Sequence, residues 1–212
     1  MEVNDPNRRL NTDNLEMRRF LKEKISLFGT VIKSAYPFEK VTRENNPEEY
    51  LVGLILNKLY SFQISLENTL LFNDVFLSIY LYRYAHELHI KIRYIFSSMD
   101  GTETKIRIDD FFADKDLKFQ EYLNGTTSDT ITEKLKETHQ ENYRLMSRFV
   151  HPNRSSLQLH LNRTDDQQFE FLVPNIRLTL WHISEILRLF SSLRLLNIHQ
   201  KISKNNLDSL QS

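Results

Sequence analysis

The segment between Tyr143 and Arg154 carries residue types that suit acid–base chemistry on a phosphodiester. On a helix, positions three, four and seven residues apart share a face, and here that face holds Arg144, Ser147, Arg148 and His151. Because Pro152 disfavours helical geometry at the residue before it, we expect His151 at a helix C-terminus, where the dipole favours its imidazolium form. Arginine would neutralise the phosphate, and histidine would move a proton.

The same segment has a structural interpretation, in which His151 and the arginines cap the exposed carbonyls of a helix end. Asn153 and Arg154 follow directly, and residues 141–163 contain four arginines and one acid. All of these bases are arginine, the residue suited to bidentate phosphate contacts. This local charge fits RNA binding, and it fits equally the self-association of oppositely charged faces.

Two pairs near residue 85 also have spacings that matter. Arg83 and Glu87 are four apart on an expected helix, which predicts either a structural ion pair or a carboxylate that orients an arginine on a buried polar side of the bundle. His86 and His89, three apart, could face one ion, but the zincin pattern needs its second histidine where Ile90 stands. We therefore expect no metal site.

Composition excludes several classes of protein. The 212 residues are 40% hydrophobic and 26% charged, with 28 basic and 28 acidic residues and no cysteine. Disulfide scaffolds and thiolate metal sites are thus excluded, and no Gly-rich phosphate loop or Gly-x-Ser-x-Gly elbow occurs. No cofactor is expected. The polar N-terminus and the charge-broken apolar runs predict a cytoplasmic protein without a membrane association.

Apolar residues recur at helical spacing through most of the chain. The stripes expected to be buried are Leu21, Ile25, Phe28, Ile32 and Ala35; Leu51, Ile55, Leu59, Phe62, Leu66 and Leu70; Leu77, Leu81, Tyr84, Leu88, Ile92, Ile95 and Met99; and Ile176, Leu180, Ile183, Leu187 and Phe190. Long helices with short loops predict antiparallel neighbours. The fold class expected for residues 1–212 is one mostly α domain, an antiparallel bundle of five to six helices.

The remaining segments are expected to differ from this pattern. Residues 100–129 carry eight acids and four bases, which predicts an acidic connector with at most a short helix over 109–123. A further helix is expected from residue 128 or 129 to about Val150. Alternating apolar residues on both sides of a polar loop predict a β-hairpin over 156–173, ended by Pro174 and inserted before the last helix. Residues 203–212 are expected to fray.

The spacing Arg144-x6-His151 resembles the Arg-x(4–6)-His signature of the HEPN superfamily. The expected helix with Arg83 and Glu87, and the order of a helix ending in His-Pro, an excursion and a return helix, are similar to that group over roughly residues 50–200. Many HEPN proteins are metal-independent ribonucleases found among toxins and antiviral defence effectors. Active members often carry Asn, Asp or His directly after the arginine, where this chain has Leu145.

The resemblance implies a site shared by two protomers, in which the RNA 2′-hydroxyl attacks the adjacent phosphate. His151 would act as general acid/base and Arg144 would stabilise the phosphorane, with Arg148 as the alternative arginine. It implies a homodimer, with RNA as the substrate and an antitoxin or defence protein as a further partner. Non-catalytic superfamily members imply the alternative, a helical module that binds RNA or protein. Aromatic residues beyond one buried stripe also favour a homodimer: Phe72, Phe76, Tyr80, Tyr82, Tyr84 and Tyr94.

Overall fold

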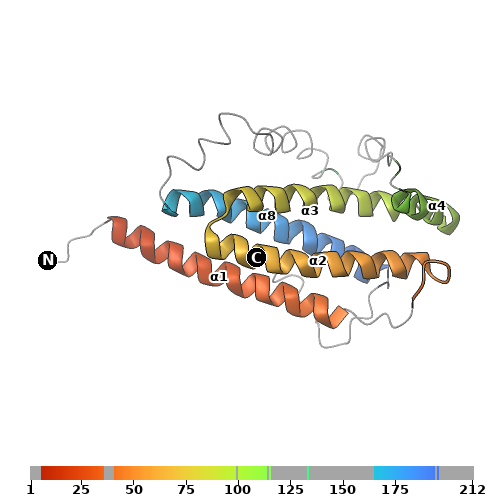
Figure 1. The fold of residues 1–212 in the computed structure, drawn as a ribbon, viewed down its shortest axis with the longest axis horizontal. Coiled ribbons are helices and arrows are strands. Elements are labelled where there is room, and N and C mark those ends of the chain that lie inside the picture. Colours follow the sequence, from red (N-terminus) through yellow and green to blue (C-terminus); the bar gives the residue numbers. More distant parts are fainter. Residues whose placement is uncertain are drawn as a thin grey trace.

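The computed structural model describes residues 6–35, 41–98, 100–113, 115, 133, 165–193 and 195, with backbone alone for residues 6–13. These residues form five helices and no strand (Figure 1). The helices are α1 (Pro6–Ala35), α2 (Pro47–Phe72), α3 (Val75–Ile95), α4 (Gly101–Phe112) and α8 (Asp165–Ser192). The mostly α fold class expected from the sequence is therefore confirmed.

Side-chain caps define the start of α2 and the junction between α2 and α3. The Asn46 side chain accepts a hydrogen bond from the backbone N–H of Glu49, and Pro47 occupies the first turn, as the sequence indicates. α2 ends at Asn73, which adopts the left-handed conformation with φ 52°. The next residue, Asp74, accepts a bond from the N–H of Leu77 and so begins α3. Asn73 and Asp74 alone therefore reverse the direction of the chain between α2 and α3.

Contacts between the helices define their relative directions. Arg18 meets Leu70 and Lys33 meets Tyr60, so α1 and α2 are antiparallel, and the tight junction makes α2 and α3 antiparallel as well. On α3 and α8, by contrast, Ser78 contacts Asn175 and Phe96 contacts Phe190, so these two helices run parallel (Figure 1). The expected antiparallel arrangement therefore holds for α1 with α2 and for α2 with α3, and it fails for α3 with α8.

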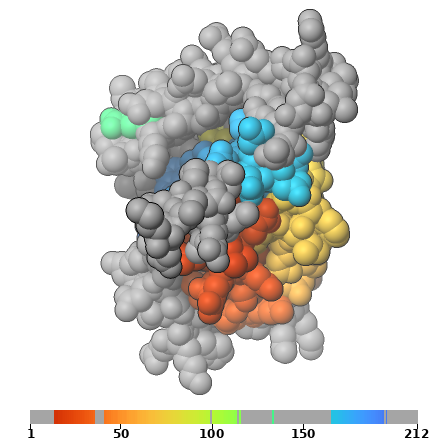
Figure 2. Space-filling view, turned by 90° about the vertical axis from the view of Figure 1, so that its left-hand side faces the viewer, coloured from red at the N-terminus to blue at the C-terminus, as the bar shows by residue number. Residues whose placement is uncertain are grey.

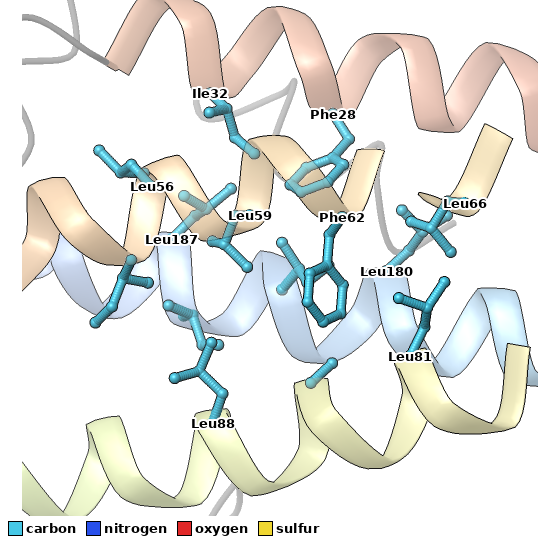
Figure 3. Packing of buried hydrophobic residues seen from close by; sticks show 14 of the residues in the cluster. Phe28, Ile32, Leu56, Leu59, Phe62, Leu66, Leu81, Leu88, Leu180 and Leu187 are labelled. Atoms are coloured by element: carbon cyan, nitrogen blue, oxygen red, sulfur yellow. The ribbon is translucent and has the colours of Figure 1, made fainter. Parts of the chain in front are cut away.

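The core lies where α1, α2, α3 and α8 meet (Figure 3). Every residue of the expected stripes on α1, α2 and α8 is buried, and so are Leu81, Leu88, Ile92 and Ile95 of α3. Leu77 and Tyr84 are partly buried and pack against this core. Each fully buried Leu, Ile or Phe contributes about 1.5–3 kcal/mol relative to an exposed one, so this shared core holds the four long helices together.

The expected β-hairpin is wrong in its second half. Residues 165–173 are the first turns of α8, and Phe169, Leu172 and Ile176 are buried at helical spacing. Asp165 and Asp166 stand in the first turn, where carboxylates favour a helix N-terminus. Pro174, expected to end the hairpin, lies inside the helix. Residues 156–164, the first half, lie outside the described residues.

The acidic stretch 100–129 begins with a helix, α4, and its residues 116–129 lie outside the described part of the chain. The Asp100 side chain accepts a hydrogen bond from the N–H of Thr102 and caps α4, which buries Thr104 and Ile108. An ion pair between Arg43 and Asp109 joins α4 to the segment before α2. None of the helices in the described part of the chain is long and apolar enough to cross a membrane.

Candidate functional site

Three buried histidines meet between the parallel helices α3 and α8. His86 Nδ1 lies 3.3 Å from His182 Nε2, and His89 Nδ1 lies 3.1 Å from His182 Nδ1. All three side chains are at most 2% exposed. Because His86 and His89 are three residues apart on α3, both project toward the same neighbouring helix, and His182 of α8 lies between them. We call His86, His89 and His182 the histidine cluster.

The cluster is packed between aromatic rings from the same two helices. The Tyr82 ring stacks on His182 with centroids 5.6 Å apart, and Trp181 contacts His182 edge-on at 4.7 Å and His89 at 5.7 Å. Burial raises the pKa of Tyr82 to about 12. The rings therefore surround the imidazoles with low-polarity material, in which a charge is costly.

The geometry of the cluster does not suit a shared metal ion. His182 directs its two ring nitrogens to two different histidines, so the three imidazoles do not converge on one point. Among the described residues, no group of three or more His, Asp or Glu side chains is arranged to hold an ion. The cluster is instead a chain of imidazoles, with His182 in the middle.

Charged side chains flank the cluster on both helices. The predicted Arg83–Glu87 ion pair forms on α3, with Arg83 Nε 2.9 Å from Glu87 Oε1, and both side chains are partly exposed. On α8, one turn after His182, the carboxylate of Glu185 lies 3.3 Å from Arg188 and is only 5% exposed. A carboxylate is seldom buried without a partner, so this pair marks a polar site within the bundle.

A polar contact continues the α3–α8 interface toward the start of both helices. The Asn175 side-chain amide donates to Ser78 Oγ at 3.1 Å, and Ser78 is buried. Beside it, Val75, Ile79 and Tyr82 form a small apolar cluster with Phe171, separate from the main core. One side of α3 thus packs in the main core, and the side toward Ser78 and His86 meets polar groups of α8.

Sequence reasoning found only part of this site. It singled out His86, His89, Arg83 and Glu87, but His182, Trp181 and Glu185 were missed. The signal that could have found them is a histidine and a glutamate within the apolar run 180–187. Leu180, Ile183 and Leu187 of this run are buried, so polar residues between them are candidates for burial too. The remaining expected site residues lie outside the described residues: Arg144, Ser147, Arg148, His151, Asn153 and Arg154.

Comparison with known proteins does not assign the chain to a group, since no family model, no curated protein and no solved structure matches it.

Proposed function

We propose that the protein is a metal-independent endoribonuclease of the HEPN type, acting as a homodimer. The observation that carries the proposal is the sequence spacing of Arg144, Ser147, Arg148 and His151, which would place all four on one face of a helix. In this reaction the RNA 2′-hydroxyl attacks the adjacent phosphorus, and the 5′-oxygen of the next nucleotide leaves with a proton. His151 is the general acid/base, and Arg144 neutralises the charge that develops on the phosphorane.

The described helices supply two features that support this proposal. The chain is mostly helical, as the resemblance implies, and α3 carries the expected Arg83–Glu87 pair in a partly buried position. A carboxylate bonded to Nε of Arg83 fixes the direction of the guanidinium. In the proposed site Arg83 and Glu87 help to position the other side chains of the site. Ser147, Arg148, Asn153 and Arg154 contact the RNA.

Exposed aromatic side chains support the homodimer. Of the aromatic residues that favoured self-association in the sequence, Phe72 is 71% exposed and Tyr80 is 53% exposed, whereas Tyr82 is buried. Large exposed aromatics are enriched at protein interfaces. A toxin or defence effector of this kind would also need a partner protein that restrains it, such as an antitoxin.

Cleavage of RNA by purified protein tests the proposal. Single-stranded RNA and tRNA are incubated with the protein in EDTA, and the products are separated on a denaturing gel. Arg144→Ala and His151→Ala should each lower the cleavage rate about 10²–10⁴-fold. Arg177→Ala removes an exposed charge on α8 and should leave the rate within about twofold. Intact RNA with the unaltered protein would overturn the proposal.

A non-catalytic RNA- or protein-binding module is the second candidate function. Leu145 favours it, because this apolar residue stands where active members of the resembled superfamily often carry a polar one. In that case the protein shifts RNA in a mobility assay without cutting it, and Arg148→Ala weakens binding as much as Arg144→Ala. Cleavage that depends on Arg148 and not Arg144 would instead identify the alternative catalytic arginine.

A further inference from the structure

The outward side of α2 has an unusual composition for the surface of a helix, which is normally polar and charged. Among residues 50–72 only Lys58 and Glu67 are charged. Lys58 lies over a tyrosine ring of α3, and Glu67 bonds to Gln63, whose amide lies against Gly29 of α1, so both charges turn toward neighbouring helices. We call the partly or fully exposed residues between them the α2 ridge: Gly53, Leu54, Asn57, Tyr60, Ser61, Ile64, Asn68, Leu71 and Phe72.

Large apolar side chains of the α2 ridge remain exposed. Leu71 is 72% exposed and Phe72 is 71% exposed, and Leu54, Tyr60 and Ile64 are exposed as well. Single exposed apolar residues are common on proteins, but a row of them along one side of a helix marks a surface that contacts another molecule. The α2 ridge therefore has the composition of an interaction surface.

The spacing of the α2 ridge indicates which partner fits it. Its positions are symmetric about the point between Phe62 and Gln63, and every member except Tyr60 has a counterpart in the ridge at the same distance on the other side. The matched pairs are Gly53 with Phe72, Leu54 with Leu71, Asn57 with Asn68, and Ser61 with Ile64. A two-fold axis at this point lays the helix antiparallel against a second copy, with each residue level with its matched residue. The ridge is thus complementary to itself.

We propose that two copies of the chain associate through their α2 ridges as an antiparallel, two-fold symmetric dimer. The inference rests on the proposed function in one respect, since it takes the homodimer from that proposal and assigns the surface that forms it. Its measurements are molecular mass and cross-linking, which do not require RNA cleavage. A second copy is the partner because an unrelated protein would not require matched positions on both sides of one point.

In this dimer, residues on the same edge of the α2 ridge and at the same height lie together. Leu54 packs against Phe72 of the second copy. Leu71 packs over Gly53 of the second copy, a position where an added Cβ would have no described atom within 4 Å. Ile64 lies beside the axis and contacts Ile64 of the second copy. The small residues Gly53 and Ser61 let the two helix axes approach to about 8 Å.

The charges next to the ridge are compatible with this arrangement. Lys58 and Glu67 are both four to five positions from the axis, so each lies about 14 Å along the helix from its own copy. This separation exceeds the Debye length of about 8 Å at physiological salt, so the repulsion between like charges is screened.

The size of the ridge gives the expected strength of association. From Gly53 to Phe72 the ridge is about 28 Å long, and a helix with its side chains is about 10 Å wide. Two such faces together bury on the order of 1,000 Å², which is near the lower limit for a specific interface. We therefore expect a dimer that dissociates at micromolar concentration.

Sedimentation of the purified chain between about 1 and 200 µM measures the dimer. The mass should rise with concentration from 25.4 kDa toward twice this value. Ile64→Asp places two carboxylates together at the axis and should raise the dissociation constant at least about 100-fold. Ile106→Asp changes an isoleucine of similar exposure on α4 and should leave the constant within about threefold. A mass of 25.4 kDa at every concentration, or an unchanged constant for folded Ile64→Asp, would overturn the proposal.

Single cysteines test the direction of the two helices, because the chain has no cysteine of its own. The Cα of Ser61 is about 6 Å from that of its copy when the helix axes are about 8 Å apart, and this distance permits a disulfide. Ser61→Cys should therefore form a covalent dimer on mild oxidation. Gly53→Cys lies on the same ridge but about 28 Å from its copy along the helix, so it should not cross-link.

The cross-links decide the matter even if Ile64→Asp does not fold, because Ser61 is exposed and Gly53 has room for a side chain. A protein that sediments as a dimer without a Ser61→Cys cross-link would overturn the α2 contact and leave the homodimer. Equal cross-linking of Gly53→Cys would overturn the antiparallel arrangement. RNA that stays intact with a protein that cross-links through Ser61→Cys would overturn the proposed endoribonuclease and leave the α2 dimer.

Discussion

The guanidinium of Arg18 on α1 lies 4.0 Å above the centroid of the Phe169 ring on α8. The same side chain donates to the carbonyl of Leu70 at 3.1 Å and to Oδ1 of Asn73 at 2.7 Å. One arginine thus joins α1, the end of α2 and the start of α8, and Figure 2 shows the surfaces of these three segments meeting at one end of the bundle. Burial lowers the pKa of Arg18, and Asp166 and Asp165 oppose that shift.

Arg18→Ala should therefore destabilise the protein by about 2–4 kcal/mol. Hydrogen bonds from a charged donor contribute roughly 1.5–3 kcal/mol and a partly desolvated cation–π contact about 1 kcal/mol more. Urea denaturation measures the difference. The neighbouring Arg19, whose side chain is 84% exposed and pairs only with Glu23 among the contacts seen, is the matched control. Arg19→Ala should stay within about 0.5 kcal/mol, and an equal loss in both variants would contradict the role of Arg18.

The core of the bundle could be predicted from the sequence because helical periodicity and burial have the same cause. Residues such as Phe28, Leu59 and Leu187 repeat every three or four positions and meet inside the bundle (Figure 3). The start of α2 could be predicted equally well, because the Asn46 side chain accepts the N–H of Glu49 and Pro47 has no N–H that needs a partner.

The false hairpin shows where a sequence pattern is ambiguous. Phe169, Phe171 and Val173 alternate as in a strand, but Phe169 and Leu172 also fit a helix that continues to Ile176. Burial against α1 and α3 decides between the two periods, and that tertiary contact is not visible in a short window.

The histidine cluster could be predicted only in part, for a similar reason. The spacing of His86 and His89 places them on one face, but their partner His182 lies 93 residues after His89. It reaches them because α8 packs against α3, here in a parallel direction. The long connection between Ile95 and Asp165 does not force a direction, unlike the two-residue junction between α2 and α3.

Two glycines at helix positions should respond differently to alanine. A Cβ at Gly53 of α2 would meet no atom within 4 Å, whereas a Cβ at Gly29 of α1 would lie 2.1 Å from Oε1 of Gln63. Alanine stabilises an open helical position by about 0.5–1 kcal/mol relative to glycine. Gly53→Ala should show this gain in urea denaturation. Gly29→Ala should gain less, because the Gln63 amide must move and give up its 2.9 Å bond to Glu67.

A companion variant checks that explanation. Gln63→Ala removes the obstructing amide, so Gly29→Ala in that background should recover a gain similar to that of Gly53→Ala. The same loss or absence of gain in both backgrounds would show that another contact of Gly29 is responsible.

Pro174 is expected to limit the stability of α8. It lies inside the helix, is exposed, and has no N–H to donate to the carbonyl four residues earlier, that of Glu170. Pro174→Ala restores this hydrogen bond and should stabilise the protein by about 1–3 kcal/mol, measured as a higher urea midpoint with an unchanged m-value. A lower midpoint would show that the proline fits a backbone bend that the fold requires.

Tyr82 predicts a loss of stability in alkali. Burial raises its pKa to about 12, while a tyrosine of the unfolded chain ionises near 10. Between these values the unfolded state has lost its proton and the folded state has kept it, so stability is fully present below about pH 10 and falls as the pH rises toward 12. The stability lost by pH 11 through this ionisation amounts to about 1 kcal/mol. Tyr82→Phe, which cannot ionise, should therefore show a smaller fall in stability between pH 9 and pH 11.

The ultraviolet absorbance of phenolate gives a direct measurement, because the unaltered protein should have one more late-titrating tyrosine than the variant. Equal alkaline slopes and equal titration curves for the two proteins would show that the Tyr82 hydroxyl is open to solvent, contrary to its 5% exposure beside His182.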